Sequence, residues 1–199
     1  MAYLYTMKKV LFVLVCVLCA NVARAQKDSL QFDEHDNYIY YKVIDKPNLS
    51  ADTLYNRAWN FARKFEPAAK PAKGTAENTL NTSSKLIVYS GVSLVRKEGG
   101  EIAYTINIQT KDQRYRYRIS NFVFKPYQRD RFGNMVLLPG IEVPLEKVAA
   151  KYGKKEADNY LNQLGVFCIN TSARLKQAMD KVPVAPKMAP VKKVSTQNW

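Results

Sequence analysis

The clearest pattern along the chain runs from Tyr104 to Ile119, where apolar and polar residues alternate. Two strands joined by a two-residue turn at Lys111-Asp112 collect all of the apolar residues on one face, because strand side chains point to alternate sides. This arrangement pairs Ile108 with Tyr115, Ile106 with Tyr117, and Tyr104 with Ile119 on the apolar face, and Gln109 with Arg114, Asn107 with Arg116, and Thr105 with Arg118 on the polar face. A slip of one residue would mix the two faces, so the pattern predicts a hairpin with fixed sides.

Other patterns flank this hairpin. Tyr38–Ile44 and Lys85–Val95 are rich in aromatic and β-branched residues, which predicts strands. Leu54–Phe65 repeats apolar residues at helical spacing after Ser50, a favourable N-cap. Residues 144–180 are also helical in pattern and predict a long C-terminal helix.

The order of these elements predicts the fold class. We expect an α+β, two-layer domain with an open antiparallel sheet of four to five strands, one helix after the first strand and the long C-terminal helix on the same face. The hairpin's second strand should continue past Phe122 and Phe124 and end before Pro126, and Tyr127–Val143 reads as irregular.

The N-terminus has the three parts of a secretory signal peptide. Lys8 and Lys9 precede the apolar run Val10–Ala20, and Ala23 and Ala25 are the small residues that signal peptidase accepts. The run is shorter than the ~20 residues of a membrane anchor, which disfavours an uncleaved anchor. Bulky residues precede both cysteines of this segment, so we do not expect lipidation.

These features divide the chain into four parts. We predict a signal peptide over residues 1–25 that is cleaved after Ala25, a flexible lead-in over 26–37, a single domain over 38–180, and a disordered Pro- and Lys-rich tail over 181–199. The mature protein is therefore expected in the periplasm or outside the cell.

Cleavage changes both the cysteine count and the charge. Only Cys168 remains, which excludes an intrachain disulfide, and the loss of Lys8, Lys9 and Arg24 lowers the formal net charge from +14 to +11. A basic excess favours an anionic partner, although it also serves solubility. We expect an anionic envelope polymer or another envelope protein, and export argues against nucleic acid.

Catalytic chemistry is not visible in the sequence. His35 is the only histidine and stands in the predicted lead-in, which excludes the usual zinc sites and catalytic triads. Cys168 falls on the apolar face of a helix and reads as a buried core thiol. Phosphate-binding and dinucleotide-binding motifs do not occur, and an enzyme that uses only carboxylates remains open. We predict no catalytic, cofactor-binding or metal-binding residues.

Arg114, Arg116 and Arg118 are the candidate binding residues. Alternation places them in a row on one sheet face, at about 6.5–7 Å between successive side chains. Arginine binds phosphates and carboxylates with two hydrogen bonds, so the row suits an anionic ligand. The alternative is a solvated outer face, while Tyr115 and Tyr117 are expected in the core.

Two segments carry a family resemblance. The Leu-Tyr-x-x-Ala-Trp motif of Leu54–Trp59 and the segment Ala103–Asn121 resemble a family of secreted bacterial domains of unknown function, described as having a fold like one repeat of the TATA-binding protein. The resemblance covers residues 38–180 and implies that fold, with Gln113 where a glycine is expected in the turn. It implies no activity and no site residues.

The sequence thus predicts an exported, non-enzymatic binding module. A structural subunit that self-associates through its open sheet is the alternative. Nucleic-acid binding and a hydrolase activity rank below both.

Overall fold

The computed structural model describes residues 29–65, 72–74, 76–91 and 97–181. The predicted signal peptide and nearly all of the predicted tail lie outside these ranges. Within them no helix is both long and apolar enough to cross a membrane. The elements follow the order β1 (Gln31–Phe32), β2 (Tyr38–Asp45), α2 (Ala51–Phe65), β3 (Ala72–Lys73), β4 (Thr79–Ser90), β5 (Lys97–Lys111), β6 (Arg114–Arg129), β7 (Met135–Leu137), β8 (Val143–Pro144), the short 3-10 helix η2 (Leu145–Lys147), α3 (Val148–Tyr152) and α4 (Lys154–Asp180).

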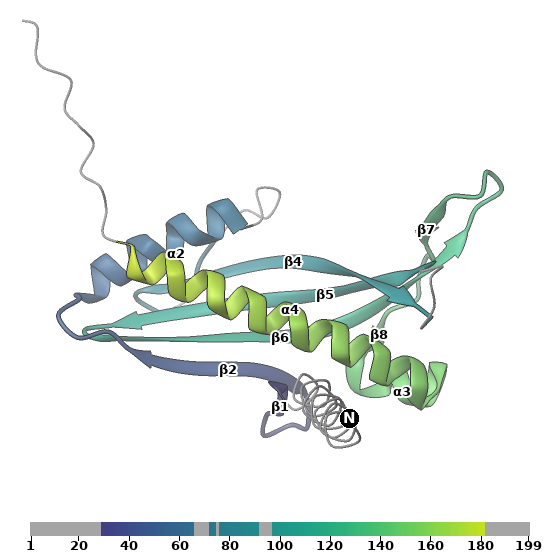
Figure 1. Cartoon of the computed structure of the whole chain (residues 1–199), viewed down its shortest axis with the longest axis horizontal. Coiled ribbons are helices and arrows are strands. Elements are labelled where there is room, and N and C mark those ends of the chain that lie inside the picture. The colour runs from purple at the N-terminus through teal and green to yellow at the C-terminus, as the bar shows by residue number, and fades with distance from the viewer. Residues whose placement is uncertain (1–28, 66–71, 75, 92–96, 182–199) are drawn as a thin grey trace, which may run out of the picture.

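The strands form one antiparallel sheet in the order β1-β2-β6-β5-β4-β3, and β7 and β8 pair with β6 outside this path. The predicted α+β class is confirmed, but the described residues contain eight strands rather than four or five. The short strands β1, β3, β7 and β8 account for the difference, because two- or three-residue segments leave no periodic pattern to detect. Figure 1 shows α4 running along the sheet with α2 beside its C-terminal part.

A single hydrophobic core lies between the sheet and the helices. Ile102, Ile106 and Tyr117 point into it from β5 and β6, and Leu54 and Leu164 meet them from α2 and α4. Ser50 caps α2, since its Oγ accepts the backbone N–H of Thr53, as predicted. Among the described residues, the helices that pack on the sheet all lie on this inner side, and none of them covers the side chains of the outer face.

The hairpin of β5 and β6 has the predicted faces but a different register. Ile108 lies opposite Tyr117 and Ile106 opposite Ile119, and the turn residues are Asp112 and Gln113. The predicted pairing was wrong by two residues, a shift that keeps each side chain on its own face. Contacts from a distant segment fix the turn: Asp112 Oδ1 accepts the backbone N–H of Ala51 at 2.8 Å, at the start of α2.

A β-bulge divides β6 into two halves. Asn121 has a left-handed backbone with φ of 58°, and the register with β5 shifts by one residue at this point. Before the bulge the odd-numbered residues Tyr115, Tyr117 and Ile119 face the core, and after it the even-numbered Phe122 and Phe124 do so. One strand can therefore present arginines outward and still return two phenylalanines to the core.

Two segments that we predicted as unstructured or irregular belong to the sheet. Residues 31–37 of the predicted lead-in form β1 and its turn into β2, held by backbone pairing of Gln31 with Ile39. β6 passes through Pro126 to Arg129 and pairs with β7, so the predicted end before Pro126 was wrong. Pro126 has no N–H to donate, but its carbonyl oxygen accepts the N–H of Leu138 at 2.8 Å and so still takes part in the backbone hydrogen bonding.

Candidate functional site

The outer face of the sheet carries the predicted arginine row. Arg114, Arg116 and Arg118 are exposed on β6, while the intervening Tyr115 and Tyr117 are each 1% exposed in the core. Residues opposite the row come from both neighbouring strands, with Tyr41, Val43 and Asp45 on β2 and Asn107, Gln109 and Lys111 on β5. The predicted placement of the row and of the two tyrosines is confirmed.

The three arginines differ in how they are held. Arg114 pairs with Asp45 at 3.2 Å, an ion pair whose side chains are 60% and 70% exposed. Arg116 donates from Nε to Gln109 Oε1 at 2.6 Å. Arg118 has no hydrogen bond or ion pair with any residue of the described ranges. An exposed pair such as Arg114–Asp45 contributes little to stability, so Arg114 remains available to a ligand.

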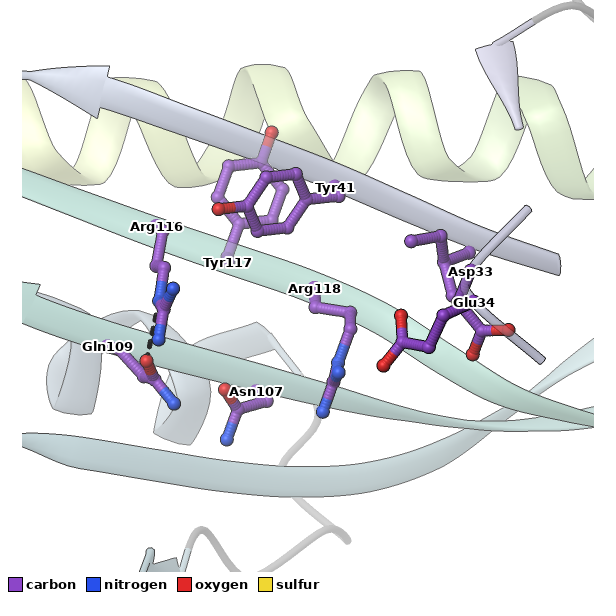
Figure 2. A pocket seen from close by; sticks show the side chains of 9 residues that line it. Asp33, Glu34, Tyr41, Asn107, Gln109, Arg116, Tyr117 and Arg118 are labelled. Atoms are coloured by element: carbon purple, nitrogen blue, oxygen red, sulfur yellow. Dashed lines mark hydrogen bonds between the residues drawn. The ribbon is translucent and has the colours of Figure 1, made fainter. Parts of the chain in front are cut away.

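Two hollows extend along this row. The first measures about 280 Å³, and Figure 2 shows the side chains around it; its lining residues are Asp33, Glu34, Ile39, Tyr41, Asn107, Gln109, Arg116, Tyr117 and Arg118. The second measures about 450 Å³ and is lined by Tyr41, Val43, Ala76, Glu77, Thr79, Gln109, Thr110, Lys111, Arg114, Tyr115 and Arg116. Arg116, Tyr41 and Gln109 border both, so the two hollows are continuous along the outer face, and their volumes lie at the small end of ligand-pocket sizes.

Acidic side chains border these hollows, and the sequence interpretation did not include them. Asp33 and Glu34 reach the first hollow from the turn between β1 and β2, and Glu77 reaches the second from the turn before β4. Their presence matters because the local charge is far more balanced than the row alone suggests. The basic excess of the chain is therefore not concentrated on this face.

The turn that carries Asp33 and Glu34 is ordered by its own side chains. Asp33 Oδ1 accepts the backbone N–H groups of His35 and Asn37, each at 2.9 Å. These hydrogen bonds, that of Asn37 first, lower the pKa of Asp33 because they favour its charged form. His35 is exposed in this turn, as a solvated residue.

The same turn occurs again between β6 and β7. Asp130 Oδ1 accepts the backbone N–H groups of Phe132 and Asn134 at 2.8 and 2.9 Å. Both turns share the spacing Asp-x-x-x-Asn, and in both the fourth residue has a left-handed backbone. This spacing is the sequence signal that could have identified an ordered turn at residues 33–37.

Away from the row, the outer face contains a buried carboxylate. Glu101 on β5 is 5% exposed, and its Oε2 accepts hydrogen bonds from Lys85 Nζ at 2.7 Å and from the Tyr127 hydroxyl at 3.0 Å. Burial, and then this hydrogen bond, raise the pKa of Tyr127 to about 12. All three groups are satisfied by one another, which points to a structural role.

Cys168 is in the core, as predicted. Its side chain is fully buried on α4, and burial raises the pKa of the thiol to about 12. A neutral, inaccessible thiol is a poor nucleophile. Among the residues that the structure describes, no three His, Cys, Asp or Glu side chains gather to hold a metal ion.

Comparison with known proteins supports the fold. Residues 40–125 match the family model of a domain of unknown function (DUF4468) with TBP-like fold. No curated protein matches the chain. The segments Leu54–Trp59 and Ala103–Asn121 lie inside this match, so the resemblance noted for them and the fold that it implies are confirmed.

Two solved structures share this architecture. A TBP-like protein from Parabacteroides distasonis is 19% identical, with a TM-score of 0.56 over 72% of this chain and 93% of its own. A DUF4468 family protein from Bacteroides ovatus is 10% identical, with a TM-score of 0.56 over 79% of this chain and 94% of its own. At these identities the likeness establishes the fold alone.

Proposed function

We propose that this chain, whose central segment matches the TBP-like domain of unknown function, is an exported, non-enzymatic binding module. Its outer sheet face contacts an anionic envelope polymer or a protein partner. The observation that supports this is the row of Arg114, Arg116 and Arg118, three exposed guanidinium groups on the side of the sheet opposite the packed helices. Unpaired Arg118 and the two hollows provide the space and the charge that a carboxylate or phosphate needs.

The row can be tested with polygalacturonate, a glycan that carries one carboxylate per sugar. Changing Arg114, Arg116 and Arg118 together to Glu should weaken binding by at least about tenfold, because attraction becomes repulsion at three contacts. Binding of the unchanged protein should fall steeply as salt rises, since exposed charges are screened. Equilibrium binding is measured by calorimetry or by biosensor at several salt concentrations.

A matched control separates the row from net charge. Lys154, Lys155 and Lys176 are exposed on α4, away from the outer face, and changing all three to Glu alters the net charge by the same amount. This variant should retain most of the affinity. Equal loss in the two triple variants would contradict a role for the row, as would binding that survives the three arginine changes.

Export is testable at the N-terminus. Protein recovered from the periplasm or the medium should begin at Gln26, which intact-mass measurement reads directly. A chain that retains Met1 in the cytoplasm would refute the assignment of residues 1–25 as a cleaved signal peptide.

Assembly through the sheet edges is the second candidate, and the edge pairing favours it. β1 pairs only with Tyr38 and Ile39 of β2, and β3 pairs only with Leu80 and Asn81 of β4. Within the described residues, most of each long edge strand therefore has no strand beside it, which is the arrangement that strand addition uses. Light scattering of the mature protein should then show a dimer that forms with rising concentration. A monomer at high micromolar concentration would rule this out.

A further inference from the structure

The first hollow holds charges of both signs that do not neutralise one another by contact. Asp33 and Glu34 line it from the β1–β2 turn, and Arg116 and Arg118 line it from β6. No ion pair joins these carboxylates to these guanidinium groups in the described part of the chain. Figure 2 shows Glu34 and Arg118 extending toward the same opening. The formal charge around this hollow is therefore zero, with its two signs separated.

Internal contacts leave one group of each sign available. The Asp33 carboxylate accepts two backbone N–H groups of its own turn, and Arg116 is held by Gln109. Glu34 and Arg118 have no such partner among the described residues. A dense polyanion would bring negative charge against Glu34 as well as toward the guanidinium groups, so it gains less at this hollow than the arginines alone would give.

Neutral groups complete the lining. Tyr41 lies opposite Arg118 on β2, and Asn107 lies opposite it on β5, with its Nδ2 donating to Asn81 Oδ1 on β4 at 2.6 Å. Side-chain amides donate and accept hydrogen bonds, which suits hydroxyl groups, and an aromatic ring offers an apolar surface to the C–H side of a sugar. These side chains come from four neighbouring strands, β2, β6, β5 and β4. Their combination of amides, an aromatic ring and a charged group resembles the lining expected for a carbohydrate site.

From these contacts we infer that the first hollow binds a zwitterionic glycan segment, one that carries a carboxylate and an ammonium group within a few sugars. The carboxylate binds Arg118, the ammonium binds Glu34, and the hydroxyls bind Asn107 and Gln109. This inference rests on the proposed function, because it uses the same outer face, and it narrows the ligand class.

The second hollow has a net positive charge, so the two ends of the outer face differ in charge. Lys111, Arg114 and Arg116 line it against the single carboxylate Glu77. A glycan that lies along β6 thus meets a net positive site beside the mixed-charge one. The ammonium-bearing part belongs at the β1–β2 turn and a further carboxylate belongs at the hairpin end.

The test compares two polymers that differ in one group. Carboxymethyl chitosan carries carboxylates and free amines, and its N-acetylated form carries the carboxylates alone. At a pH where the amines are protonated and the carboxylates ionised, the full mature chain should bind the free-amine polymer about fivefold more tightly. Affinity is measured by calorimetry at low salt.

Single substitutions then assign the groups. Glu34→Gln should abolish the preference for the amine, and it should not weaken binding of the N-acetylated polymer, because it removes a repulsion against the polymer's carboxylates. Glu34 is chosen over Asp33 because the Asp33 side chain orders the turn. Arg118→Gln should weaken binding of both polymers. Glu77→Gln, the matched control at the second hollow, should leave the preference for the amine intact.

Each other result has a definite meaning. Equal affinity for the two polymers, with loss in the triple arginine variant, overturns the zwitterion inference and leaves the proposed function standing. No binding of either polymer overturns the zwitterion inference and, with it, the proposal that the outer face binds an anionic polymer. A random copolymer of lysine and glutamate that binds as tightly, with the same dependence on Glu34, overturns the assignment of a glycan.

Discussion

Replacing Gln113 by glycine should stabilise the domain. Gln113 is the second residue of the β5–β6 turn and has a φ of 62°, in the left-handed region. Its backbone N–H donates to the Leu49 carbonyl at 2.8 Å, and its carbonyl accepts the Lys46 N–H at 2.7 Å. Both hydrogen bonds belong to the backbone and survive the substitution. The side chain is exposed, so its removal costs no packing.

The magnitude follows from two opposing terms. An L-residue pays about 1–2 kcal/mol to occupy the left-handed region, and glycine does not. Glycine costs about 0.5–1 kcal/mol in added freedom of the unfolded chain. The net gain in the free energy of unfolding is then about 0.5–1 kcal/mol, which raises Tm by about 2 °C in a domain of this size.

Urea unfolding followed by circular dichroism measures this gain. The midpoint should rise while the slope m stays constant, because the same surface is exposed on unfolding. Gln113→Ala keeps the strain and should change the free energy of unfolding by less than about 0.5 kcal/mol. Gln177→Gly makes the same chemical change on the exposed side of α4 and should lower stability. An unchanged or lower midpoint for Gln113→Gly would refute the reasoning about turn strain.

Two further predictions concern the core. Leu164→Ala removes a fully buried side chain between α4 and the sheet and should lower the free energy of unfolding by about 2–5 kcal/mol in urea titrations, and a loss below about 1 kcal/mol would show that the core collapses around the gap. Burial raises the pKa of Tyr115 and Tyr160 to about 12 from an unfolded value of 10.0, so the folded state favours their neutral form. Their contribution to stability is full below pH 10 and is lost as the pH rises toward 12, which a falling urea midpoint between pH 9 and 11.5 should show; a constant midpoint would contradict it.

Alternation along the hairpin predicted which face each residue occupies, but not the pairing. A shift of two residues leaves every side chain on its own face, so the pattern of Tyr104–Ile119 fits both registers. The choice between the two registers depends on hydrogen bonds of the turn. Asp112 accepts the N–H of Ala51, the first residue of α2, and Gln113 donates to the carbonyl of Leu49, just before that helix. Such contacts join segments about sixty residues apart and leave no local signal.

The candidate site, like the hairpin, could be predicted only in part from the sequence. Arg114, Arg116 and Arg118 lie on one strand, and their alternation is visible in the sequence. Glu34 and Glu77 come from two separate turns, and only the folded sheet brings them to the row. The sequence therefore indicated a basic row and missed the acidic side chains that balance it.

The position of all packed helices on one side of the sheet has a consequence for divergence among related proteins. Residues that point inward determine whether the chain folds, and, on the proposed function, residues that point outward on β2, β5 and β6 determine what it binds. Because strand side chains alternate, the two sets share no position. We expect the few identities between this chain and its structural relatives, 19% and 10%, to gather at inward positions. The same scaffold can then acquire a new ligand through changes at Tyr41, Asn107 and Arg118, with the core unchanged.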